Sequence, residues 1–193
     1  YFLVHRMAKA MKIEEVVRAT EYLGVYFRHI TRDASEIVPL EMEYRHIEAY
    51  IELQALRFHN RITPDVEPIP DRLRAVPVPR LLLQPMVENA YQHGLKETLE
   101  DGVIRISVGE RLEGQTAVLL FSVEDNGGEL TDEALARLQD KLSGKPGDKE
   151  TTGLLNVHLR VQLRYGGGYG LTLSRGELGG LRVGLRLPIE SKS

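Results

Sequence analysis

The sequence predicts an α+β protein in which an N-terminal helical hairpin precedes a two-layer α/β sandwich, with helices packed on one face of a β-sheet. The helix breakers support this division, because of nine prolines and eighteen glycines only Pro39 and Gly24 lie before residue 63. Apolar residues recur at helical spacing in the first part, whereas β-branched strand patterns alternate with helical stretches in the second. We therefore divide the chain into a helical region, residues 1–62, and an α/β domain, residues 63–193.

Two helical stripes, separated by the polar residues 31–35, define the expected hairpin. The second helix should begin near Pro39, which suits a first turn, with Glu41 and Glu43 near the positive end of the helix dipole. One hairpin cannot bury two stripes alone, so we expect two copies to form a four-helix bundle, and hence a homodimer through residues 1–62. The alternative is that the hairpin packs on the downstream domain. The stripes are Ile13, Val16, Thr20, Leu23, Phe27 and Ile30 in the first helix, and Leu40, Tyr44, Ile47, Ile51, Gln54 and Phe58 in the second.

The α/β domain should contain two pairs of antiparallel strands, one around the turn Glu113-Gly114-Gln115 and one around a glycine-rich turn at residues 176–180. Antiparallel strands with helices on one face make a two-layer sandwich. Residues 143–152 are polar and contain glycine and proline, so we expect a mobile lid there. The expected strands span residues 102–110, 117–123, 170–174 and 181–189, and the expected helices span residues 80–94, 131–142 and 154–165.

Composition narrows the classes of function. A net charge of -3 and a pI near 6.1 argue against a nucleic-acid partner held by phosphate neutralisation. The chain has no cysteine, so neither a disulfide framework nor a thiolate metal site is available. No apolar run approaches the ~18 to 20 residues of a membrane helix. Because the chain opens at Tyr1 and not at Met, we expect a fragment of a longer protein, with any membrane-bound or sensory part upstream. We expect this fragment to be the cytoplasmic part of a membrane-anchored protein, and the absence of cysteine fits the cytoplasm.

Three short segments follow one another at intervals of about thirty residues. The first is an apolar helical stretch, residues 83–94, that contains Asn89. The second is Asp125-Asn126-Gly127-Gly128, after an apolar strand, and the third is Gly153-Leu154-Leu155-Asn156. Taken singly, a helical Asn is usually solvated or capping, and Asp-Asn-Gly is a common turn. In this order they resemble the N, G1 and G2 boxes of the GHKL ATP-binding domain, the Bergerat fold shared by gyrase, MutL and the histidine kinases.

The resemblance implies ATP and Mg²⁺ as cofactors. It implies that the carboxamide of Asn89 anchors Mg²⁺, a hard ion that takes oxygen ligands. It also implies that Asp125 accepts a hydrogen bond from the adenine amine and that Gly127 leaves room for the ring. Helix N–H groups from Gly153 onward favour phosphate. Arg160 either helps to neutralise phosphate charge or is a solvated or structural arginine. The expected ATP-binding residues are Glu88, Asn89, His93, Asp125, Gly127, Thr152, Gly153, Leu154 and Asn156.

A narrower resemblance covers nearly the whole chain. Residues 81–94 resemble the N box of LytS/YesM-type sensor histidine kinases, and residues 40–58 are similar to the second bundle helix of that group. The resemblance implies the catalytic portion of a two-component kinase, which transfers the γ-phosphoryl of ATP to a histidine and thence to a response regulator. The group's Pro-His-Phe-Leu-Phe-Asn acceptor motif does not occur here, so we expect the acceptor upstream of Tyr1 and no self-phosphorylation. His5, His29, His46 and His59 all lack the context of that motif.

Three departures and two alternatives accompany the resemblance. Glu129 and Thr151 stand where the family usually has glycine, and Leu181 replaces a threonine, so we expect ordinary or weakened ATP binding. An ATP hydrolase of the gyrase and MutL kind would carry a glutamate base one turn before Asn89, where this chain has Pro85. Glu88 points about 100° away from Asn89 around a helix and is a poor substitute. The other alternative is a degenerate nucleotide-sensing or scaffolding module.

Overall fold

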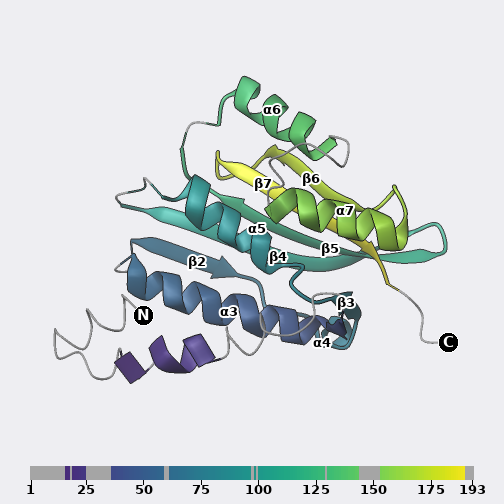
Figure 1. The fold of residues 1–193 in the computed structure, drawn as a ribbon, viewed down its shortest axis with the longest axis horizontal. Helices are drawn as coiled ribbons and strands as arrows, with labels where there is room; N and C mark the ends of the chain where they lie inside the picture. Colours follow the sequence, from purple (N-terminus) through teal and green to yellow (C-terminus); the bar gives the residue numbers. More distant parts are fainter. Residues whose placement is uncertain are drawn as a thin grey trace.

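The computed structural model describes residues 16–17, 19–24, 36–58, 61–96, 98, 100–128, 130–143 and 153–189. Its centre is a five-stranded sheet in the order β2-β4-β5-β7-β6, with helices on one face (Figure 1). This arrangement confirms the predicted α+β sandwich. The strands are β2 (Ile62–Val66), β4 (Gly102–Glu113), β5 (Thr116–Asp125), β6 (Gly170–Arg175) and β7 (Leu181–Pro188).

The four predicted strands are confirmed, and both predicted pairs are antiparallel. β4 and β5 form a hairpin, and β5 also pairs antiparallel with β7. A fifth strand, β2, was not predicted, and it joins β4 in parallel. Sequence patterns missed β2 since it contains Pro64 and mostly exposed residues. Proline is tolerated on an edge strand, where one side of the backbone needs no partner.

The helices of the sandwich differ from prediction mainly at one end. α6 (Asp132–Ser143) and α7 (Gly153–Tyr165) agree with their predicted ranges within one residue. The helix predicted over residues 80–94 begins later, as α5 (Gln84–Asn89), and continues as the π-helical segment η1 (Ala90–Gly94). The preceding residues form a turn, because Leu81 has φ of +55°, which no helix accommodates. Unpredicted short elements are β1 (Ile37–Pro39), β3 (Pro77–Pro79) and α4 (Asp71–Arg74).

The long helix α3 (Leu40–Arg57) begins directly after Pro39, as predicted, and all six residues of its stripe are buried. All of them except the polar Gln54 belong to the same core cluster as the inward side chains of the sheet. Tyr44 packs edge-on to Phe121 of β5 with ring centroids 6.3 Å apart, and Phe58 lies 5.9 Å from Tyr91 of η1. The stripe therefore packs on the sandwich, which is the alternative that the sequence left open. The homodimer stays a prediction.

The opposite side of α3 contacts the described part of the first helical stripe. Leu53 of α3 forms a small cluster with Ala19, and Val16 and Leu23 pack against it. Ile13, Phe27 and Ile30 of that stripe lie outside the described residues, as does the predicted lid from residue 144 to residue 152. Within the described ranges, no helix is both long enough and apolar enough to cross a bilayer.

Candidate functional site

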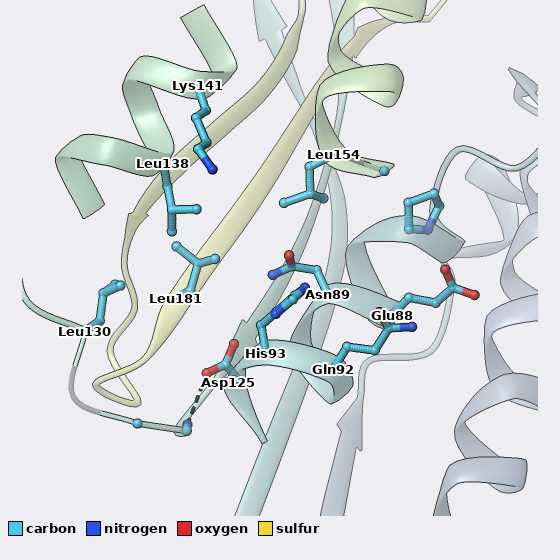
Figure 2. Close-up of a pocket in the computed structure, with 15 residues that line it drawn as sticks. Glu88, Asn89, Gln92, His93, Asp125, Leu130, Leu138, Lys141, Leu154 and Leu181 are labelled. Atoms are coloured by element: carbon cyan, nitrogen blue, oxygen red, sulfur yellow. Dashed lines mark hydrogen bonds between the residues drawn. The ribbon is translucent and has the colours of Figure 1, made fainter. Parts of the chain in front are cut away.

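A cavity of about 490 Å³ opens between the α5–η1 helix, the end of β5 and the first turn of α7, with α6 forming its far wall (Figure 2). It brings together seven of the nine residues predicted for ATP. Asn156 does not belong to this set, because it is exposed and does not line the cavity. Thr152 lies outside the described residues. The predicted residues that line the cavity are Glu88, Asn89, His93, Asp125, Gly127, Gly153 and Leu154.

Asp125 is the last residue of β5 and lies at the base of the cavity with only 2% of its surface exposed. Its Oδ1 accepts a hydrogen bond of 3.0 Å from the N–H of Gly127. Burial raises the pKa of this carboxyl to about 6, although the N–H groups of Gly127 and Leu181 favour the charged form. Asp125 is therefore ionised at neutral pH and is a strong acceptor in a site of low polarity.

Glycines surround this carboxylate because nothing larger fits. A Cβ on Gly94 would lie 2.5 Å from the carboxylate of Asp125, and one on Gly180 would lie 2.3 Å from its Oδ1. A Cβ on Gly127 would lie 1.8 Å from the carbonyl oxygen of Gly94. Gly127 thus leaves room for the backbone of η1. From the sequence, this glycine was expected to leave room for a ligand ring instead. The loop after β5 and the end of η1 are held together at the floor of the cavity.

Asn126, beside Asp125, has a structural role. Its Oδ1 accepts from the N–H of Val103 at 2.7 Å, and its Nδ2 donates to the carbonyl of Asp101 at 2.8 Å. These two bonds fasten the loop after β5 to the start of β4. Because both ends of the amide are used, Asn126 keeps the neighbouring Asp125 in a fixed position.

Asn89 and His93 lie side by side on the helix that borders the cavity, opposite Leu154 of α7 (Figure 2). The π-helical turn from Ala90 widens the helix but still brings residue 93 about one turn after residue 89. Glu88 points away from Asn89 in Figure 2, as helical geometry requires, and accepts from Nε2 of Gln84 at 2.5 Å. Asn89 is therefore the side chain that the helix offers to the centre of the cavity.

The first turn of α7 provides the neighbouring wall. Gly153 begins the helix at the cavity, where its N–H and those that follow lack helical partners. Arg160, farther along α7, does not line the cavity. Its guanidinium donates to the carbonyls of Arg80 at 2.7 Å and Leu81 at 3.4 Å. Of the two roles considered for Arg160, the structure supports the structural one.

Sequence reasoning missed the wall formed by α6. Lys141 extends from α6 toward the cavity, and three leucines provide apolar surface beneath it (Figure 2). Lys141 follows Leu138 by three residues, so the helical period was the available signal, but no motif marks α6. The cavity therefore combines a buried carboxylate, an apolar wall and a cation. The leucines are Leu130, Leu138 and Leu181, the last being the replacement noted in the sequence.

A self-sufficient metal site does not exist among the described residues, where no three His, Cys, Asp or Glu side chains cluster. The single neutral oxygen of Asn89 fits a different arrangement, in which phosphate oxygens and water complete the shell of a Mg²⁺ ion. The residues present are therefore compatible with a metal that arrives with a nucleotide.

Comparison with known proteins adds family relationships. Residues 3–62 match the model of the histidine kinase family, and residues 78–191 match the model described as histidine kinase-, DNA gyrase B-, and HSP90-like ATPase. The chain is 31% identical over 175 residues to the sensor histidine kinase BtsS of Escherichia coli, covering 91% of this chain and 28% of BtsS. It is 26% identical to the sensor histidine kinase YesM of Bacillus subtilis, covering 98% of this chain and 30% of YesM. The chain thus spans less than a third of the length of these relatives.

Solved structures agree on the fold. The catalytic domain of histidine kinase ThkA aligns with a TM-score of 0.52 at 16% identity, over 80% of this chain and 95% of that domain. ThkA in complex with the response regulator protein TrrA aligns with a TM-score of 0.51 at 15% identity, over 80% of this chain and 42% of that chain. At such identities the likeness establishes the architecture of the sandwich and nothing finer.

Proposed function

Because this chain belongs to the histidine kinase-, DNA gyrase B-, and HSP90-like ATPase family, we propose that it is the ATP-binding catalytic portion of a LytS/YesM-type sensor histidine kinase. Its activity would be transfer of the ATP γ-phosphoryl to a histidine and then to a response regulator. The observation that carries the proposal is the cavity that joins buried Asp125 to Asn89 and to the first turn of α7. Residues 63–193 would form the catalytic domain, and residues 1–62 the dimerising region.

The cavity suggests one orientation for the nucleotide. Asp125 lies at its base and accepts hydrogen bonds, so it suits the exocyclic amine of adenine, while the leucines flank the flat ring. The phosphates would then extend toward Asn89, Lys141 and the N–H groups that begin at Gly153. Mg²⁺, bound with the nucleotide, would neutralise phosphate charge. Catalysis by this chain would consist of positioning and charge neutralisation.

Two further assignments follow from the family. None of the chain's histidines lies in the family's acceptor motif, so the phosphoryl acceptor would be a histidine outside this sequence and the chain would not label itself. ThkA is seen in complex with the response regulator TrrA, which supports a response regulator as the final acceptor here. The first transfer would use ATP and the second a response regulator, so we assign the chain to the cytoplasm.

The hydrolase alternative lacks a base. Pro85 lines the cavity at the position where hydrolases of the family carry glutamate. Glu88 is directed away from Asn89 and is hydrogen-bonded to Gln84. The scaffolding alternative rests on Glu129, Thr151 and Leu181. Of these only Leu181 lies among the described residues, and it contributes to the apolar wall without blocking the cavity.

Calorimetric titration with ATP, with Mg²⁺ and with EDTA, tests the assignment. Asp125→Asn keeps the shape but turns an N–H₂ toward the adenine amine, so it should cost roughly 2 to 4 kcal/mol, about 30- to 1000-fold in affinity, in both conditions. Asn89→Ala should weaken binding with Mg²⁺ and have much less effect in EDTA. Equal losses for Asn89→Ala in both conditions would exclude Asn89 as the metal ligand. No ATP binding by the unsubstituted chain would refute the proposed function.

A further inference from the structure

A buried polar cluster lies outside the cavity, between α3, the turn before α5, and α7. Glu43 and His46 are three residues apart on α3, so they share one face, and their exposed fractions are 0% and 1%. Burying a carboxylate and an imidazole is costly unless hydrogen bonds compensate. Neither side chain lines the cavity, and the proposed chemistry uses neither. The contacts of these two residues show what the cluster holds.

Glu43 holds the start of the cavity helix. Its Oε1 accepts from the N–H of Leu81 at 2.8 Å, and its Oε2 accepts from Leu82 at 2.8 Å and Leu83 at 3.1 Å. These N–H groups precede the first turn of α5, where a helix has unpaired donors and a positive dipole end. A side chain of α3 thus caps a different helix, the one that carries Asn89.

α7 holds the same turn from the other side. Arg160 donates to the carbonyls of Arg80 and Leu81. Burial lowers the pKa of its guanidinium, and the negative charge of Glu43 opposes this shift. Leu81 keeps a left-handed backbone, φ +55°, between these two anchors. Such a conformation is unfavourable for a branched residue and persists only where the surroundings enforce it. The turn therefore fixes α5 relative to both α3, which lies outside the cavity, and α7, whose first turn borders it.

Gln84 carries the connection from His46 to the cavity. Its Nε2 donates to Glu88 at 2.5 Å, so its Oε1 faces His46, 2.6 Å from Nε2. A carboxylate only accepts, which fixes the orientation of the amide and makes His46 Nε2 the donor. Gln84 is 6% exposed, and Glu88 is followed directly by Asn89. One hydrogen-bonded chain therefore joins α3 to the residue beside the proposed metal ligand.

We propose that Glu43, His46 and Gln84 are positioning residues, through which α3 sets the placement of Asn89 and hence the affinity for the metal-bound nucleotide. This inference rests on the proposed function. Because coupling between two sites is reciprocal, occupancy of the cavity by MgATP must also be felt at His46. The effect should belong mainly to the metal-dependent part of binding, since Asp125 is the last residue of β5 and hydrogen-bonds to the loop that follows it, whereas Asn89 lies on the helix that begins at the anchored turn.

The test compares His46→Leu with His46→Gln and with Tyr44→Phe. His46→Leu removes the donor to Gln84, whereas a glutamine at this position can still donate. Tyr44→Phe is the matched control, because it deletes another hydrogen bond of α3, the partly buried one from the Tyr44 hydroxyl to the carbonyl of Glu67, which is not part of the cluster. Calorimetric titration gives the ATP affinity of each variant with Mg²⁺ and with EDTA, and thermal unfolding gives its stability.

We expect His46→Leu to weaken MgATP binding about tenfold, the effect of one buried hydrogen bond, and to change binding in EDTA much less. His46→Gln should restore most of the loss, and Tyr44→Phe should lower the melting temperature without changing either affinity. Equal losses with and without metal, or the same loss in Tyr44→Phe, would overturn the proposal. Failure of the unsubstituted chain to bind ATP would instead refute the proposed function.

A second measurement uses the unsubstituted chain and therefore does not depend on whether a variant folds. The imidazole NMR signals of His46, in the unsubstituted chain, should shift when MgATP saturates the cavity and shift less with ATP in EDTA. Unchanged His46 signals at saturation would refute the coupling even if His46→Leu fails to fold.

Gln84→Met, which removes both hydrogen bonds of the amide while keeping the length of the side chain, should reproduce the selective loss of MgATP affinity.

Discussion

The chemistry of the cavity depends most on a single carboxyl, that of Asp125. Its raised pKa of about 6 records the cost of burying a charge, which the N–H groups of Gly127 and Leu181 offset only in part. A buried acceptor with unused hydrogen-bonding capacity is prepared for a donor, and an adenine amine is such a donor. The same burial leaves little further surface to lose when a ligand arrives, since Asp125 is only 2% exposed.

Nucleotide binding should therefore lower the pKa of Asp125. A donor that binds the ionised form favours ionisation, and here little additional desolvation opposes it. Carboxyl carbon NMR of aspartate-labelled protein should show one group titrating near pH 6, absent in Asp125→Asn, and moving to lower pH with saturating MgATP. By linkage, ATP affinity should fall as the pH decreases through 6. A pKa that rises or stays constant with MgATP would contradict the adenine assignment.

At the scale of elements, α7 links the cavity to the edge of the sheet. Gly153 begins the helix at the cavity, and one turn later Nδ1 of His158 accepts from the N–H of Leu171 on β6 at 3.0 Å. A Cβ on Gly170 would lie 2.8 Å from that nitrogen, so the strand passes close to the ring. Because Nδ1 must accept, this contact requires a neutral imidazole at this nitrogen.

The attachment of α7 to β6 should weaken in acid. Burial lowers the pKa of His158 below its ordinary value of 6.5, so the unfolded chain binds the proton more readily than the folded one. The stability contributed at high pH is thus lost as the pH falls below 6.5. His158→Asn can accept from Leu171 without titrating. Urea unfolding from pH 8 to pH 5 should show the unsubstituted chain losing more stability than the variant, and parallel profiles would contradict this role.

At the scale of the whole molecule, α3 belongs to the core of the sandwich. Its buried stripe packs with inward residues of the sheet and with Tyr91 of η1, in one continuous cluster. The boundary at residue 62 proposed from sequence therefore separates segments that share a core, although they match two family models. The sequence change near residue 63 marks a change in secondary structure, and the core extends across it.

A chain that starts at Thr63 should accordingly be far less stable than one that starts at Glu36. It loses several large buried side chains, each worth about 1.5 to 3 kcal/mol, against a total stability of about 5 to 15 kcal/mol. Urea unfolding should show a cooperative transition for the longer chain and none, or a much lower midpoint, for the shorter. Equal midpoints would mean that α3 contributes little to the core.

Light scattering on the full chain and on the chain that starts at Glu36 tests the homodimer. If residues 1–62 mediate dimerisation, the full chain should be dimeric at tens of micromolar, and the chain that starts at Glu36 should form a weaker dimer or be monomeric. If both chains are monomeric, the homodimer prediction is wrong, and the apolar stripe of α3 serves only to pack this helix on the sandwich.

The sequence by itself determined what depends on neighbours along the chain. Periodicity and turn residues located four strands to within three residues at each end and two helices to within one residue, and the three motifs predicted Asn89, Asp125 and Gly153 as residues of one site. These features are local, because helical period, strand alternation and capping are properties of consecutive residues. The order of the three motifs along the chain indicated the family, and the resemblance to that family specified the GHKL type of sandwich.

Only the tertiary structure decided which surfaces meet. A buried stripe on α3 shows that one face is covered, but the period of a helix cannot say whether a second copy or the sandwich covers it. The sequence related Glu43 only to the dipole of its own helix and left the role of Arg160 open, whereas in the structure both anchor the turn before α5. Lys141 and the parallel strand β2 were also missed, because no motif marks α6 and because β2 contains Pro64 and mostly exposed residues. Their positions follow from contacts between residues far apart in the chain, which no local pattern contains.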